Sequence, residues 1–103
     1  MWAQLVSARL KPGTDSDLQK LFDLLQAAEQ PGSGLVRSTA FRDQNDPSRL
    51  RMVVVFEDEA KARARESDPR RQDALAEVRA TMGAVFDGAP EFADLMVIND
   101  FAP

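Results

Sequence analysis

The chain has 103 residues, 44% of them hydrophobic and 29% charged, which is typical of one folded domain rather than a disordered chain. Its formal net charge of −4 argues against a nucleic-acid partner, which would need a basic face. Cys, His and Tyr are all absent. Their absence excludes disulfides, thiolate metal sites, thiol nucleophiles and the usual general base near neutral pH. We therefore expect one domain over residues 1–103 that has no metal site and needs no cofactor.

Neither the apolar runs nor the N-terminus suggests a membrane protein or a secreted protein. No apolar run approaches the roughly 20 residues of a membrane span, and residues 1–10 lack the basic-then-apolar pattern of a signal peptide. A chain without cysteine is also compatible with the reducing cytoplasm. We expect a cytoplasmic protein with no membrane partner.

Alternating and helical spacings of apolar residues, interrupted by Pro and Gly, divide the chain into strands and helices. Thr14 has the character of a helix N-cap, with Asp17 three residues later. Asp68-Pro69 is a second helix start, an N-cap followed by Pro at the first helical position. In chain order we expect a strand over 2–10, a helix from Thr14 to Pro31, strands over 35–42 and 50–56, a short helix over 57–66, a long helix from Asp68 to Gly88 and a final strand over 91–101.

With the short helix as an addition, this β-α-β-β-α-β order is that of the ferredoxin-like fold in the α+β class. Right-handed crossovers place both long helices on one face of a four-stranded antiparallel sheet. RNA-recognition domains share the order, but residues 49–56 lack both central stacking aromatics of their third strand. Because the net charge also has the wrong sign, we reject an RNA-binding function.

The strands predict a second copy of the chain as a partner. In the third strand Met52 and Val54 point one way while Val53 and Val55 point the other, so both faces are apolar. The chain has no third layer to cover the second face. We expect a homodimer that packs sheet to sheet about a two-fold axis. The candidate interface residues are Val53, Val55, Leu95, Val97 and Phe101.

Short motifs along nearly the whole chain resemble one known family. They are Lys11-Pro12-Gly13, Pro31-Gly32, Asp46-Pro47, the stretch from Val54 to Ala60, and the stretch from Ser67 to Arg70. In this order and spacing they resemble the antibiotic biosynthesis monooxygenase (ABM) domain family of the dimeric α/β-barrel superfamily. The resemblance implies a dimer whose two sheets form one barrel, with a small-molecule cavity between sheet and helices in each subunit. It also implies that an electron-rich aromatic such as an anthrone, or haem, reacts there with dioxygen without a flavin or metal from the protein.

The side chains that carry this chemistry in the best-understood members are replaced here. The Trp of those members corresponds to Phe56, their Asn to Met52 or Val6, and a His common in the family to Ala64 and Arg65. Two functions therefore stay open. One is a cofactor-independent monooxygenase, an oxidoreductase acting on a hydrophobic aromatic or quinol-like compound. The other is a non-catalytic ligand-binding or regulatory dimer, and no catalytic residue is predicted.

The candidate pocket residues lie mostly on the strand faces that the resemblance directs toward the cavity. Trp2 either stacks on a ligand or packs at the sheet edge or dimer seam. Gln4 is a polar side chain on an apolar face and is a candidate hydrogen-bonding group. Arg37 either binds an anionic ligand or belongs to a surface or interface ion pair. The full set of ligand-pocket candidates is Trp2, Gln4, Val6, Arg37, Met52, Phe56 and Met82.

Arginines gather in the two later helices, with acidic residues between them. An interleaved pattern of this kind is typical of a solvated helix face. We therefore expect these side chains to be exposed and assign them no role in a site. They are Arg63, Arg65, Arg70, Arg71 and Arg79.

Overall fold

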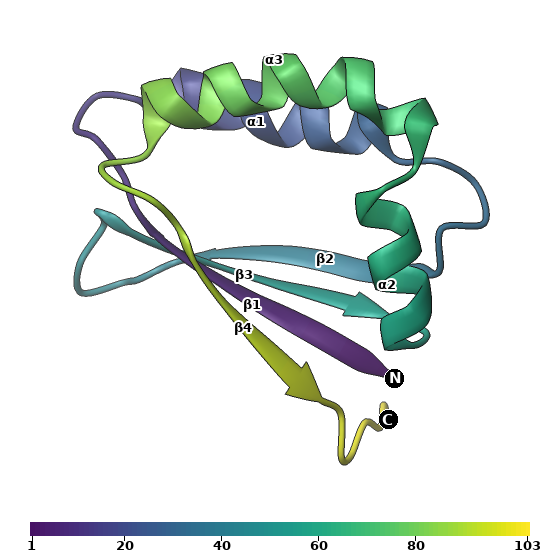
Figure 1. Ribbon diagram of the computed structural model, residues 1–103. Coiled ribbons are helices and arrows are strands. Elements are labelled where there is room, and N and C mark those ends of the chain that lie inside the picture. Colours follow the sequence, from purple (N-terminus) through teal and green to yellow (C-terminus); the bar gives the residue numbers. More distant parts are fainter.

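Four strands and three helices make up the chain, which a computed structural model describes over residues 1–103. They are β1 (Trp2–Arg9), α1 (Asp15–Ala28), β2 (Leu35–Arg42), β3 (Arg49–Phe56), α2 (Glu59–Glu66), α3 (Pro69–Val85) and β4 (Glu91–Met96). The strands form one antiparallel sheet in the order β2-β3-β1-β4. Helices α1 and α3 pack against each other over one face of the sheet, α2 lies at one end, and the other face carries no helix (Figure 1). The predicted ferredoxin-like α+β fold is confirmed.

Helices α1 and α3 begin where the sequence predicts and α2 begins two residues later, at Glu59, but only one of the two predicted caps uses its side chain. Asp68 Oδ1 accepts a hydrogen bond from the Arg70 N–H at 2.9 Å, and Pro69 opens α3. Thr14 occupies the N-cap position of α1, yet its hydroxyl donates to the Lys11 carbonyl at 2.7 Å and makes no cap bond. The capping interaction predicted for Thr14 is therefore wrong, because the preceding turn takes its hydroxyl. None of the three helices is long and apolar enough to cross a lipid bilayer.

The last strand is shorter than the predicted range of 91–101. Strand β4 ends at Met96, which lies opposite Trp2 of β1. One further backbone bond joins the Val97 N–H to the Met1 carbonyl at 3.3 Å, and no backbone bond continues the ladder after it. Residues 98–103 therefore leave the sheet, and Phe101 is exposed.

The buried side chains form two separate clusters on the helix face of the sheet. The first lies where β1 and α3 end and contains Leu10, Leu18, Leu21, Leu50, Val78, Val85 and Phe86. The second lies beside α2 and contains Trp2, Val54, Phe56 and Ala62. Only 15 of the 103 residues are buried, because one face of the sheet is bare and the helix face is only partly filled.

Strand β3 has apolar side chains on both faces, as predicted. Met52 and Val54 face the helices, whereas Val53 and Val55 lie on the bare face. On the same bare face, Leu95 of β4 is 40% exposed. The structure therefore shows an apolar sheet face that no part of this chain covers.

Candidate ligand-binding site

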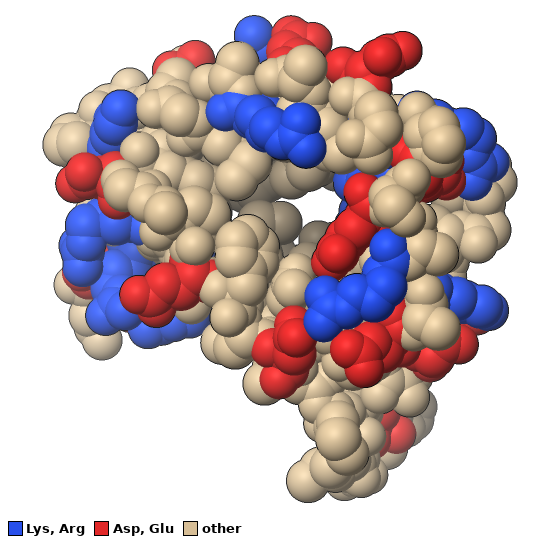
Figure 2. All heavy atoms as spheres, viewed as in Figure 1, with Lys and Arg blue, Asp and Glu red and all other residues tan.

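A cavity of about 680 Å³ lies between the sheet and helices α1 and α3. Figure 2 shows it as an opening between the helix layer and the sheet. Of its 22 lining residues 14 are hydrophobic. Every helix and strand contributes at least one of the 22 residues, and α2 contributes only Arg65. Small-molecule sites usually measure about 300–1,000 Å³ and are mostly apolar. The cavity therefore has the size and the lining needed to enclose a flat ring system.

The space exists because the side chains that face it from β2 are short, while α1 and α3 pack against each other rather than against the middle of the sheet. Ser38 and Ala40 of β2 lie opposite Val54 and Met52 of β3, and all four line the cavity. Neither a hydroxymethyl nor a methyl group can reach across to α1. Helix α2 closes one end of the gap between sheet and helices (Figure 1). The first core cluster thus holds α1 and α3 to the sheet at one end, the second packs α2 against the sheet at the other, and the middle stays open.

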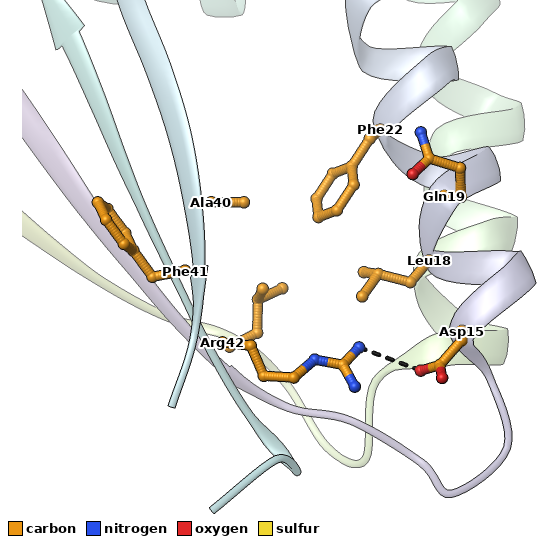
Figure 3. A pocket seen from close by; sticks show the side chains of 8 residues that line it. Asp15, Leu18, Gln19, Phe22, Ala40, Phe41 and Arg42 are labelled. Carbon is orange, nitrogen blue, oxygen red and sulfur yellow. Dashed lines mark hydrogen bonds and ion pairs between the residues drawn. The ribbon is translucent and has the colours of Figure 1, made fainter. Parts of the chain in front are cut away.

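A smaller pocket of about 250 Å³ adjoins the cavity beside β2. The two spaces share Gln19, Phe22 and Ala40. Figure 3 shows Phe22 reaching from α1 toward β2, while Arg42 of β2 is joined to Asp15 at the start of α1. Arg42 Nη2 lies 3.1 Å from Asp15 Oδ1, and both side chains are exposed. This pocket is too small for most ligands by itself and extends the cavity toward the edge of the sheet.

One end of the cavity is charged. Arg65 of α2 donates to both carboxylate oxygens of Glu29, from Nε to Oε1 at 3.2 Å and to Oε2 at 3.0 Å, and from Nη2 to Oε2 at 2.7 Å. The Arg65 guanidinium also lies 5.3 Å from the centre of the Phe56 ring. Burial raises the pKa of Glu29, but the hydrogen bonds from Arg65 and Ser33 and the charges of Arg65 and Arg71 outweigh it, so this pKa lies below its ordinary value. Glu29 is therefore ionised at neutral pH and is a weak base.

Most of the predicted pocket residues line this cavity. They are Gln4, Val6, Met52, Phe56 and Met82. Gln4 Nε2 donates to Asp94 Oδ1 at 3.3 Å, which fixes the amide at the wall. Trp2 is buried but does not line the cavity, because α2 covers its ring. The centre of the Trp2 ring lies 6.0 Å from that of Phe56 and 5.1 Å from the guanidinium carbon of Arg63. Trp2 thus has a packing role at the end of the sheet.

Arg37 lies on the opposite face of the sheet, so the prediction that it lines the cavity is wrong. A β-bulge between Leu35 and Arg37 shifts the register of β2: Leu35 lies opposite Phe56, but Arg37 lies opposite Val55. One extra residue in a strand transfers the side chains that follow to the other face. Arg37 is therefore exposed on the bare face, beside Val55.

The sequence prediction missed the arginines at the charged end. Arg65 and Arg71 were expected on a solvated helix face, but both line the cavity, as does the exposed Arg79, and Arg71 is only 4% exposed. The spacing along α3 contained a signal for this burial. Arg71 lies four residues before Leu75 and seven before Val78, so it continues the apolar stripe of that helix.

The sequence matches neither the profile of a known protein family nor any curated protein. Solved structures match over nearly the whole chain. One from Chloroflexus aurantiacus is 21% identical, with 98% of this chain and 96% of that chain covered and a TM-score of 0.69. One from Nitrosomonas europaea is 15% identical, with 96% and 100% covered and a TM-score of 0.74. One from Caulobacter crescentus is 15% identical, with 95% and 90% covered and a TM-score of 0.75. Each is described as a "putative antibiotic biosynthesis monooxygenase".

The topology and the cavity define a ferredoxin-like α+β protein with a ligand-sized space between its sheet and helices. More specifically, the chain has the fold of the ABM structures to which it is similar, over almost its full length. The fold that the short sequence motifs predicted is thus confirmed. TM-scores of 0.69 to 0.75 establish a common fold, but at identities of 15% to 21% they establish nothing more, and a fold by itself does not determine an activity.

Proposed function

We propose that the protein is an ABM-like homodimer that binds a hydrophobic aromatic or quinol-like small molecule in the cavity of each subunit. The observation that carries this proposal is the cavity itself, about 680 Å³ in volume and lined mainly by apolar side chains. Phe22 and Leu25 of α1 and Leu75 and Met82 of α3 face Met52 across the space, which suits a planar ring. Burying the faces of such a ring contributes roughly 25 cal/mol per Å² of apolar surface.

One candidate activity is oxidation of the bound compound by dioxygen without a cofactor. A deprotonated anthrone supplies the electrons: one oxygen atom becomes the new carbonyl of the quinone, and the other leaves as water with the two hydrogens of the methylene carbon. The protein would position the ring and stabilise its anion. Polar groups in the wall that can serve this purpose include Gln4, Arg65, Arg71 and Arg79.

A specific observation also favours a non-catalytic binding or regulatory dimer. Met52 and Phe56 line the cavity at the positions where the family resemblance implies an Asn and a Trp. Neither side chain can hydrogen-bond to the oxygen of a substrate anion. The one carboxylate in the wall, Glu29, is already bound by Arg65. Binding without turnover is therefore the second candidate function.

The homodimer is supported by the bare face of the sheet. Val53, Val55 and Leu95 lie there without cover from any helix, and burying each would contribute about 1.5–3 kcal/mol at most. A second copy packed against this face about a two-fold axis would remove them from water. Val97 and Phe101 follow the end of β4, and in the proposed dimer they contact the partner subunit.

Oxygen uptake with anthrone, against a protein-free blank, separates the two candidate functions. Saturable, protein-dependent uptake with formation of anthraquinone would establish the monooxygenase. A matched variant, Met52→Trp with Met82→Trp, places two indole rings in the cavity and should abolish that uptake. Saturable binding of anthrone without uptake would establish the non-catalytic function. Absence of both binding and uptake would contradict the proposal for this class of compound.

A further inference from the structure

Arg71, in the first turn of α3, is a buried cation with most of its hydrogen-bonding capacity unused. It lines the cavity and is 4% exposed. Its Nη1 donates to the Arg65 carbonyl at 3.1 Å, and this is the only hydrogen bond of its guanidinium, which has five N–H donors. Its Nε is buried and has no partner. Unsatisfied buried donors are rare in folded proteins, and each calls for a physical explanation.

The carboxylates near Arg71 do not neutralise it, because each has another partner. Glu29 binds Arg65, Asp68 binds Arg70 and Glu66 binds Arg63. Arg71 forms no ion pair, unlike the other arginine at this end of the cavity, Arg65. The charged end of the cavity therefore carries one uncompensated positive charge.

Burial lowers the pKa of Arg71, and the neighbouring charge of Arg65 lowers it further, while Glu29, Asp68 and Glu66 oppose the shift. An arginine nevertheless stays protonated in proteins, so the charge remains in place. Leaving a buried charge without a counter-ion is costly. A bound anion would remove that cost and supply the missing acceptor.

We propose that Arg71 binds an anionic oxygen of the ligand, so that the cavity prefers aromatic compounds that carry one carboxylate or phenolate group. This inference rests on the proposed function, since it names the class of ligand that the cavity takes. Arg79 also lines the cavity without an ion pair, but it is exposed, so Arg71 is the one buried and uncompensated arginine in a mainly apolar wall. A single buried cation suits a monoanion with a large apolar ring better than a phosphate with two charges.

The length of the apolar stripe on α3 also suits such a ligand. Leu75, Val78 and Met82 follow Arg71 along the side of α3 that lines the cavity. At a rise of 1.5 Å per residue the row from Arg71 to Met82 is about 16 Å long. A ligand of two or three fused rings lies along this row with its acidic oxygen at Arg71.

The test compares two probes of nearly the same shape, the anion naphthalene-2-carboxylate and the neutral naphthalene-2-carboxamide, by calorimetric titration of the protein of residues 1–103. We expect Arg71→Met to reduce the preference for the carboxylate over the carboxamide roughly 10- to 100-fold, the value of a hydrogen bond to a charged group. Binding of the carboxamide should be unchanged. Arg49→Met is the matched control, because it removes the same charge from an exposed residue that forms no ion pair.

A second measurement needs no variant and tests the phenolate. The protein is titrated against 4-nitro-1-naphthol, whose anion absorbs visible light. Binding beside Arg71 should lower the pKa of the naphthol, so the anion band should grow when excess wild-type protein is added at a pH below that pKa. Arg71→Lys should retain part of this effect, because it retains the charge but loses the planar fork of donors.

The outcomes distinguish this inference from the proposed function. The role of Arg71 is overturned if the carboxamide binds but Arg71→Met does not change the preference for the carboxylate. It is also overturned if binding does not lower the pKa of the naphthol. Either result leaves the proposed function standing. Failure of every probe to bind the wild-type protein overturns both. If Arg71→Met does not fold, Arg71→Lys and the naphthol titration decide between the same outcomes.

Discussion

Replacing Glu29 with Gln removes the carboxylate that holds Arg65 at the charged end of the cavity. The wild-type pair has three N···O contacts of 2.7 to 3.2 Å. Its side chains are 16% exposed for Arg65 and 22% for Glu29. Hydrogen bonds to charged groups contribute about 1.5–3 kcal/mol, and removing one partner of a fully buried pair costs about 3–5 kcal/mol. Because this pair keeps some contact with solvent, we expect Glu29→Gln to lower the free energy of unfolding by roughly 2 kcal/mol.

Urea denaturation followed by circular dichroism measures this loss. With an m value of about 1–3 kcal/mol/M, the midpoint should fall by about 1 M. Asp15→Asn is the matched control, since it breaks an ion pair with Arg42 whose side chains are 84% and 41% exposed. Exposed pairs contribute about 0–1 kcal/mol. Both variants are measured at one protein concentration, because a dimer's stability depends on concentration. Equal losses in the two variants would refute this reasoning.

The same pair predicts a pH dependence. The pKa of Glu29 is lowered in the folded protein, so its carboxylate stabilises the fold fully above the unfolded value. That contribution is lost as the pH falls through the folded pKa. The difference in stability between wild type and Glu29→Gln should therefore be largest near neutral pH and shrink on acidification below the ordinary value of 4.5. A difference that grows on acidification would contradict the assignment.

Five further substitutions test three other features of the structure. Val55→Asp places a charge on the bare sheet face and should convert the proposed dimer to a monomer in light scattering; an unchanged mass would argue against that interface. Asp68→Ala should cost about 1 kcal/mol of unfolding free energy and Thr14→Ala clearly less, because only the aspartate caps its helix. Gly34→Ala and Gly88→Ala both strain a backbone at φ +84°, and each should cost about 1–2 kcal/mol. The loss should be larger at Gly34, where a Cβ would lie 2.7 Å from a lysine side chain of α2, whereas nothing lies within 4 Å at Gly88.

The fold could be predicted because its signals are local. Asp68-Pro69 marks the start of α3, and the alternation along β3 indicates which side chains face the helices. The end of β4 is different. Val97, Ile98 and Phe101 continue the apolar pattern after Met96, but a strand needs a partner, and the last backbone bond between this segment and β1 is the one from Val97 to Met1. Composition alone does not show at which residue the hydrogen bonding between two strands ends.

The site was less predictable, because burial there depends on contacts between distant elements. The face on which Arg37 lies is set by a bulge in β2, and nothing in the residues from Leu35 to Arg37 indicates an extra residue in the ladder. Arg71 is buried by the junction of α2 and α3, where it meets the Arg65 carbonyl. Its place on the apolar stripe of α3 indicated burial, but the interleaved charges on the same helices favoured exposure.

A titration of the isotope-labelled protein with naphthalene-2-carboxylate, followed by amide chemical shifts, shows directly whether a ligand binds between the sheet and the helices. We expect saturable shifts at Gln4, Ser38 and Leu75, which line the cavity on three different elements. Arg37 and Val55 on the bare face should move little in the same titration. Shifts confined to that bare face, or no saturable shifts at any concentration of the probe, would contradict a ligand site between the sheet and the helices.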